Sequence, residues 1–132
     1  MMKKPVRAKW PQREFEVWRN KEVEGRRPIP DEVADMAALI QPMVDDYIDH
    51  RCFDLRIGSP DIRLLAQVDI WAQLVRLAEE QMVISTAKCQ EESLPWAATS
   101  EASDSASVTT FCRRYRERVE KVINEHEAVE QP

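Results

Sequence analysis

The sequence predicts an all-α protein, and three observations carry that prediction. Its 132 residues include two glycines and eight prolines. So few glycines cannot supply the turns of a many-stranded barrel or sandwich, nor a glycine-rich phosphate loop. Apolar residues also recur at three- and four-residue steps over long segments. We therefore expect a small helical domain with a kinked helix, a buried central helix and a C-terminal heptad-like helix, preceded by a basic N-terminal arm.

The arm, residues 1–30, differs in charge from the rest of the chain. Residues 1–27 carry nine basic and four acidic side chains, a balance of +5, whereas the whole chain carries −5. A basic arm on an acidic body favours binding of a polyanion through the arm, although a solvated terminus has the same composition. A short helix is expected just after Pro11. The candidate nucleic-acid-binding residues of the arm are Lys3, Lys4, Arg7, Lys9 and Arg13.

The next segment, from residue 31 to about 53, predicts an amphipathic helix. Asp31 follows Pro30 and is suited to the N-cap position. The apolar stripe keeps its phase across Pro42, so we expect one kinked helix rather than two. Three acidic residues near the middle of this helix lie on its outer face, where we expect them to be solvated: Asp45, Asp46 and Asp49. The stripe itself consists of Val33, Met36, Ala37, Ile40, Met43, Val44, Tyr47 and Ile48.

A turn at Gly58 leads to the central helix, expected over residues 62–86. Ser59 and Pro60 are typical of a helix start. Apolar residues cover most of its circumference, which indicates burial on several sides, within the domain or against copies of itself. One polar line is expected to face solvent, consisting of Asp69, Gln73, Arg76 and Glu80.

Residues 88–107 are rich in serine and predict a polar loop, so the helical domain is expected to be residues 31–132 with this loop inside it. The last helix, from about residue 106 to 128, has a seam at alternating three- and four-residue steps. That seam fits either packing on the central helix or self-association. Its candidate oligomer contacts are Val108, Tyr115, Val119 and Val122, and the candidate nucleic-acid contacts of this helix are Arg113 and Arg114.

Signatures of catalysis and metal binding are missing from the sequence. There is no nucleotide-binding loop, no zinc-protease motif and no nucleophile elbow. The three cysteines are odd in number and widely spaced, which argues against a disulfide framework and against a zinc site: Cys52, Cys89 and Cys112. The N-terminus does not resemble a signal peptide, and no segment is long and apolar enough to span a membrane. We therefore expect a cytoplasmic protein, not an enzyme, without cofactor, metal or membrane partner.

Over residues 31–128 the order of elements resembles the small terminase subunits of tailed bacteriophages. The resemblance rests on the kinked helix, the turn Ile57-Gly58-Ser59-Pro60-Asp61, the central helix rich in Leu, Ala and Trp, the Leu94-Pro95-Trp96 segment and the arginine-rich last helix. It implies a helical protomer that forms a homo-oligomeric ring, recognises double-stranded viral DNA and regulates a packaging ATPase. If so, basic residues of the arm or of the last helix are expected to meet phosphate.

Two functions therefore follow from the sequence. The first is a DNA-binding assembly protein, suggested by the arm, the apolar central helix and the C-terminal seam. The alternative is a small adaptor or inhibitor that binds another protein through its acidic helical surface, because an acidic surface suits a basic partner.

Overall fold

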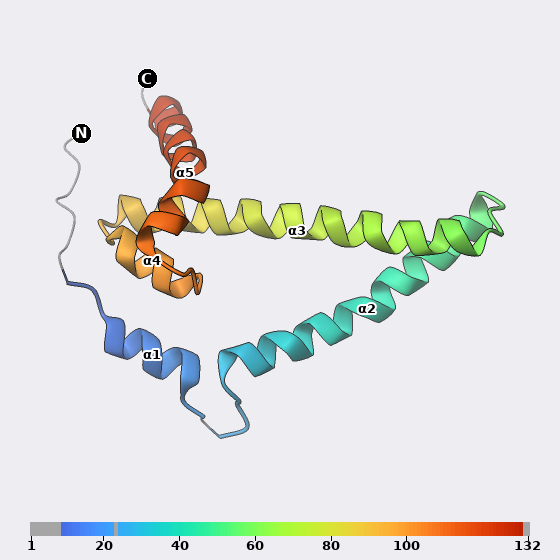
Figure 1. Ribbon diagram of the computed structural model, residues 1–132, viewed down its shortest axis with the longest axis horizontal. Helices are drawn as coiled ribbons and strands as arrows, with labels where there is room; N and C mark the ends of the chain where they lie inside the picture. The colour runs from blue at the N-terminus through green and yellow to red at the C-terminus, as the bar shows by residue number, and fades with distance from the viewer. Residues whose placement is uncertain (1–8, 23, 131–132) are drawn as a thin grey trace. The chain divides into compact units, whose positions relative to one another are not determined.

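The computed structural model describes residues 9–22 and 24–130 and consists of helices joined by short connections (Figure 1). The expected all-α fold is confirmed. The candidate residues Lys3, Lys4 and Arg7 lie outside the described residues. The helices are α1 (Gln12–Asn20), α2 (Ile29–Asp54), α3 (Pro60–Glu91), α4 (Trp96–Ala102) and α5 (Val108–Glu130).

The chain divides into two compact units, with one boundary between Gln12 and Arg13, at the start of α1, and the other inside α3, between Arg76 and Leu77. We call residues 13–76 unit 2 and the remaining described chain unit 1. This division differs from the expected one, in which an arm of residues 1–30 precedes a helical domain of residues 31–132. No change of composition marks either boundary, because a continuous helix crosses each of them.

Helix α2 runs without interruption from Ile29 to Asp54 with Pro42 inside it, which confirms one helix rather than two. Its start differs from the prediction, since Pro28 occupies the N-cap position and Asp31 lies in the first turn. Proline has no side-chain oxygen with which to cap the helix. The carboxylate of Glu32 instead accepts a hydrogen bond of 3.1 Å from the backbone N–H of Arg27, which holds the chain just before the first turn.

In unit 2, α2 packs against the first half of α3 through one row of side chains from each helix. Val44, Ile48 and Cys52 are buried and recur every four residues. On α3 they meet a second four-residue row, in which Ala66, Ile70 and Leu74 are partly buried. Interlocking of such rows makes helices cross at an angle rather than lie parallel. Accordingly, α2 and the first half of α3, both in unit 2, separate with distance from the turn that joins them (Figure 1).

The first half of α3 is largely exposed, so the expected burial of the central helix within the domain does not occur there. The fully buried residues of α3 are Val83, Thr86 and Ala87, all in unit 1. A single neighbouring helix covers one stripe of α3, whereas its apolar residues extend around most of the circumference. Burial against copies of the chain stays a prediction. The polar line of Asp69, Gln73, Arg76 and Glu80 is exposed, as expected.

Residues 88–107 are not a polar loop, because α3 continues to Glu91 and α4 begins after a connection of four residues. Two of the side chains that suggested a loop, Thr99 and Ser103, instead bond to carbonyls of the preceding turn. Thr99 Oγ1 donates to the carbonyl of Trp96 at 3.2 Å, and Ser103 Oγ donates to that of Ser100 at 3.0 Å. Bonding to a preceding carbonyl satisfies a hydroxyl without solvent. Thr99 is accordingly buried.

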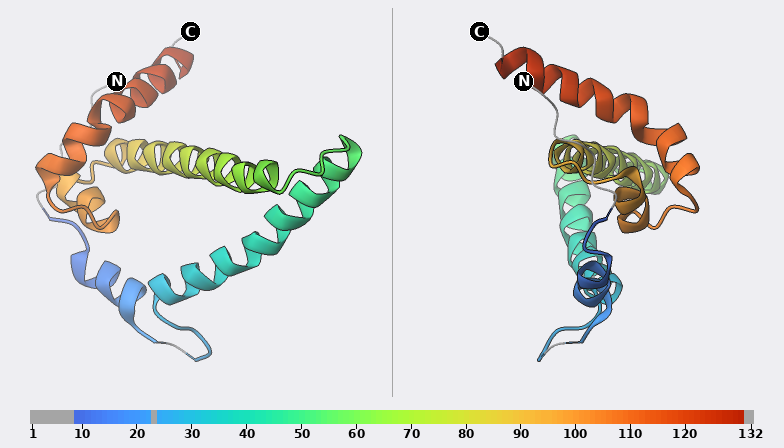
Figure 2. Two further views of the ribbon diagram at one scale, coloured as in Figure 1. Left: turned by 45° about the vertical axis from the view of Figure 1, so that its right-hand side comes forward. Right: turned by 90° about the vertical axis from the view of Figure 1, so that its left-hand side faces the viewer.

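The core of unit 1 lies where α4 and α5 pack against the second half of α3 (Figure 2). Phe111 and Val119 of α5 are almost wholly buried there, together with Ala87 of α3. Phe111 also makes tilted ring contacts with Trp96 and with Tyr115, with ring centroids 6.1 and 5.2 Å apart. Such aromatic contacts add to the stabilisation from burial.

Three helices end on a left-handed residue that is not glycine. Arg56, Ser93 and Asp104 have φ values of 56°, 65° and 58° and follow α2, α3 and α4. After α2, the N–H of Ile57 bonds to the carbonyl of Cys52 at 2.8 Å, and that of Arg56 to the carbonyl of Phe53 at 3.1 Å. This pair of bonds defines a Schellman cap, which ordinarily has glycine at the left-handed position. The chain therefore ends these helices without using its two glycines.

Candidate assembly and nucleic-acid interfaces

The apolar stripe of α2 separates into two rows in the structure. One row, Val44, Ile48 and Cys52, is buried against α3. The other row is exposed and lies mainly in the N-terminal part of the helix; we call it the α2 row. Its members are Val33, Met36, Ile40, Met43 and Tyr47.

The side chains of the α2 row are largely open to solvent. Met43 is 70% exposed, and Leu39 beside the row is 73% exposed. Contiguous exposed apolar residues of this kind mark contact surfaces. The sequence pattern predicted an amphipathic helix but not this division. An apolar stripe that contacts two neighbouring surfaces has the same residue periodicity as a stripe that contacts one.

The first half of α3 presents a second exposed apolar surface, which we call the α3 row. Its members are Leu64, Leu65, Val68 and Val75, each more than half exposed. Unit 2 thus buries three side chains fully while it exposes many large apolar ones. Small domains with so little buried surface are marginally stable by themselves. Covering these rows would stabilise unit 2 by removing apolar area from water.

Helix α2 is also strongly acidic, with seven acidic side chains and one basic, Arg51. Asp45, Asp46 and Asp49 are exposed, as expected. Asp49 forms an ion pair with Arg63 of α3, and Asp45 accepts a hydrogen bond of 2.9 Å from the Gln41 side chain. Within the described residues no group of acidic, histidine or cysteine side chains is arranged to hold a metal ion.

Most of the arginines of α5 are engaged inside unit 1. The carboxylate of Glu79 on α3 lies 3.4 Å from Arg114 and 3.5 Å from Arg118. It also accepts a hydrogen bond of 3.4 Å from the hydroxyl of Tyr115. Both guanidinium groups lie over the Tyr115 ring, at 5.4 and 5.9 Å from its centroid. This placement adds a cation–π attraction to the ion pairs.

Glu79 was not singled out from the sequence, since a lone glutamate on a helix carries no signal of its partners. Its position near Arg114 means that this candidate phosphate contact is partly neutralised within the protein. Arg116 is likewise paired with Glu120 at 2.9 Å, and this hydrogen bond raises the pKa of the Arg116 guanidinium. Contact of Arg114 with DNA would therefore compete with an existing ion pair.

Three of the candidate basic residues, Arg113, Lys9 and Arg13, are exposed and have no ion pair in the part of the chain that the structure describes. Lys9 and Arg13 belong to the arm, and Arg113 lies on the exposed side of α5. Among the described residues no hydrogen bond or ion pair joins Lys9 or Arg13 of the arm to Arg113 or Arg114 of α5.

The C-terminal seam is used within the chain. Tyr115 and Val119 are buried in the core of unit 1, and Val122 is partly buried against it. Of the four predicted oligomer contacts, Val108 is the exposed one, at 41%. Of the two alternatives, the structure therefore has the last helix packed on the central helix. Self-association through this seam stays a prediction.

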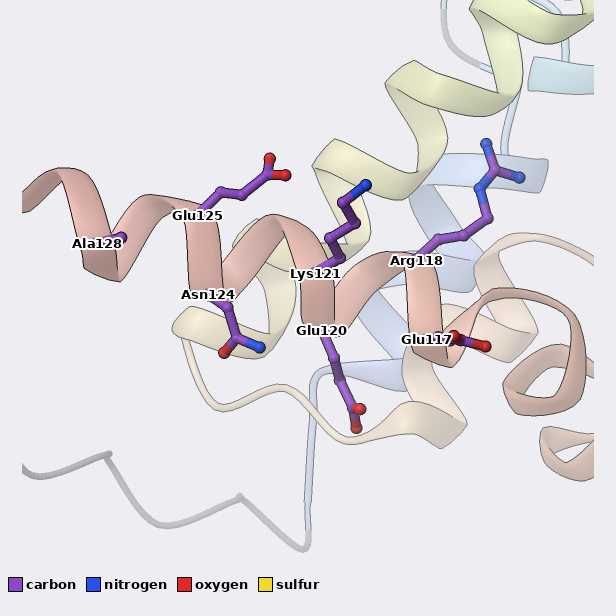
Figure 3. A pocket seen from close by; sticks show the side chains of 7 residues that line it. All are labelled: Glu117, Arg118, Glu120, Lys121, Asn124, Glu125 and Ala128. Atoms are coloured by element: carbon purple, nitrogen blue, oxygen red, sulfur yellow. The ribbon is translucent and has the colours of Figure 1, made fainter.

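Helix α5 carries an open hollow of about 670 Å³. All seven residues that line it come from α5, including Glu120, Lys121 and Asn124. In Figure 3 the side chains of Glu120 and Asn124 point to one side of the helix and those of Lys121 and Glu125 to the other. A hollow along a single helix has no opposing wall, so it does not enclose a ligand as small-molecule sites do.

The three thiols are free of disulfides, and each histidine has a bonding partner within the chain. Cys52 is buried in unit 2. Burial raises the pKa of the partly buried Cys89 thiol, which lowers its fraction of reactive thiolate. His50 Nδ1 lies 2.7 Å from the carbonyl oxygen of Asp46, one turn earlier in α2. His126 Nδ1 lies 3.1 Å from Glu91, which ties α5 to the end of α3.

Across the described residues, every helix is too short or too polar to cross a lipid bilayer. Comparisons with protein-family models, with curated proteins and with solved structures found no significant match to this chain.

Proposed function

We propose that this chain is a non-enzymatic helical assembly protein whose copies associate through unit 2 and which binds double-stranded DNA through basic residues of the arm and α5. A single observation carries the assembly part. Unit 2 leaves the α2 row and the α3 row uncovered, although each is as apolar as the row that holds the two helices together.

Self-association is the simplest way to cover both rows. The two rows belong to different helices, so each copy offers two apolar surfaces. Two separate surfaces allow each copy to contact two neighbours, and such contacts close into rings when the rotation permits. The resemblance to small terminase subunits suggests such a ring, with a packaging ATPase as a further partner.

The DNA-binding part rests on charge. Residues 1–27 have a balance of +5 on a chain of −5. The exposed Lys9, Arg13 and Arg113 have no ion pair among the described residues. Lys and Arg neutralise phosphates and release counterions, so affinity arising in this way falls steeply with salt.

Sedimentation of the full chain over a range of micromolar concentrations, with and without duplex DNA, tests the proposal. We expect a mass above that of the 15.4 kDa monomer that rises with concentration, and DNA binding at low salt. A monomer at every concentration contradicts the assembly part, and absence of binding at low salt contradicts the DNA part.

A matched pair of variants refines the DNA experiment. Arg113→Gln removes an exposed and unpaired charge, whereas Arg116→Gln removes one already paired with Glu120. If Arg113 contacts phosphate, its loss lowers the slope of log affinity against log salt by about 1. Arg116→Gln is expected to change the slope less. Equal effects of the two variants on this slope would show that Arg113 does not contact phosphate.

A second candidate function has its own supporting observation. Helix α2 combines the exposed α2 row with a charge balance of seven acidic residues to one basic. Such a helix suits a basic, apolar surface on a different protein. Recovery of one stoichiometric basic partner, by a chain that is monomeric alone and does not bind DNA, would favour this adaptor function.

A further inference from the structure

The members of the α2 row follow a heptad pattern. Val33, Met36, Ile40, Met43 and Tyr47 are separated by three, four, three and four residues. Residues at such steps form the seam of a coiled coil. We infer that the α2 row pairs in parallel with the α2 row of a second copy of this chain. This inference rests on the proposed function, of which it specifies one interface.

The residue types along the row favour a parallel pair of helices. Taking Val33 as an a position makes Ile40 and Tyr47 the next a positions, and Met36 and Met43 the d positions. β-Branched residues at a, as at Val33 and Ile40, with leucine at d favour two-stranded parallel coiled coils, and here Met takes the place of leucine at d. Position 42, occupied by proline, is then a c position, which faces away from the partner helix, so the ring does not obstruct the contact.

The charges beside the row indicate the same orientation. In this register Asp46 is a g position and Arg51 is the e position five residues later, and those two positions meet across a parallel pair. Both side chains are exposed, and neither has an ion-pair or hydrogen-bond partner in the described chain. Two-fold symmetry gives the pair two Asp46–Arg51 contacts. An antiparallel pair brings g to g and e to e, which separates the two charges.

Cysteine cross-linking tests the orientation directly, because residues at d positions meet their own copies across a parallel seam. We expect Met36→Cys and Met43→Cys each to form a disulfide between two copies under mild oxidation, with linkage mapped by peptide mass spectrometry. Ala38→Cys, at an f position on the opposite side of α2, is the matched control and is expected not to cross-link. An antiparallel or head-to-tail contact leaves Met36→Cys and Met43→Cys without self-links, which would overturn the inference.

Charge reversal provides a second and independent test. Asp46→Arg and Arg51→Asp each place like charges opposite one another, and each is expected to raise the dissociation constant of the pair about tenfold. The double variant D46R/R51D restores opposite charges at unchanged net charge and is expected to return to the wild-type value. If net charge alone matters, Asp46→Arg tightens association and Arg51→Asp weakens it, a result that contradicts the pairing.

The two tests separate this inference from the proposed function. An oligomer that persists without Met36 or Met43 self-links, and without rescue by D46R/R51D, leaves assembly standing and overturns parallel pairing through α2. A chain that is monomeric at all concentrations overturns both. Far-ultraviolet circular dichroism of each variant shows that α2 remains helical; all the substituted positions are exposed.

Discussion

Unit 1 and unit 2 are similar in helix content but opposite in how they use their apolar residues. Unit 1 gathers Phe111, Tyr115 and Val119 into one core with Val83 and Ala87. Unit 2 fully buries three side chains and leaves two apolar rows exposed. The comparison teaches that unit 1 has a complete core within one chain, whereas unit 2 resembles one half of an interface.

The largest expected effect compares the same substitution at a buried and at an exposed site. Phe111 is 1% exposed in the core of unit 1, whereas Phe53 of unit 2 is 82% exposed. Phe111→Ala should lower the free energy of unfolding by about 3 to 5 kcal/mol, because it leaves a cavity. Phe53→Ala should change it by about 0.5 kcal/mol or less at low protein concentration, as surface substitutions do. Urea unfolding measures both, and equal effects would contradict the contrast between the units.

The second prediction concerns association. Met43→Asp places a charge in the α2 row and should raise the dissociation constant of the oligomer at least about tenfold, since burying a Met side chain is worth about 1.5 to 3 kcal/mol. Val129→Asp makes the same kind of change at an exposed residue of α5, in unit 1. It should leave the oligomer unchanged in sedimentation experiments. A larger effect of Val129→Asp on the dissociation constant would show that the assembly surface lies in unit 1.

The third prediction tests the ion pairs of unit 1. Glu79→Gln weakens the contacts with Arg114 and Arg118 and with the hydroxyl of Tyr115. It should lower the free energy of unfolding by about 1 kcal/mol, the upper end for ion pairs of solvent-exposed side chains. The control Glu80→Gln, on the exposed polar line of α3, should have almost no effect. Thermal unfolding of the two variants distinguishes them, and a neutral Glu79→Gln would show that the network adds nothing to unit 1.

The smallest expected effect is at the turn of unit 2. Arg56 has a left-handed φ of 56°. Arg56→Gly should stabilise the protein by about 0.5 to 1 kcal/mol, because glycine adopts this conformation without steric cost. Leu55→Gly changes the preceding residue, which has φ of −89°, and should not stabilise. Denaturant unfolding measures both variants, and stabilisation by Leu55→Gly alone would contradict the assignment of the cap.

Periodicity and composition predicted the all-α fold, the single helix through Pro42 and the last helix, because each depends on the order of residues within one segment. Helix α4 was missed because Ser and Thr are common in loops, and only the structure shows Thr99 and Ser103 bonding to preceding carbonyls. The boundary at Arg76 was missed because it leaves no local signal within a continuous helix.

The candidate surfaces were predictable to a smaller extent. The seam of α5 was identified, but the pattern fits an intrachain contact and an intermolecular one equally, and Tyr115 and Val119 form the intrachain contact. The apolar stripe of α2 was also identified, yet its division into a buried and an exposed row depends on where α3 packs. Which apolar stripe remains uncovered is a property of the tertiary structure alone.

Hydrogen–deuterium exchange of the full chain at low and high concentration tests most directly whether a second copy covers unit 2. Covered helices exchange more slowly because local opening is suppressed. We predict that peptides from α2, Ile29–Asp54, gain protection as concentration rises, while peptides from α5 in unit 1 exchange at a constant rate. Identical exchange of α2 at both concentrations, in a range that extends to high micromolar, would contradict the account.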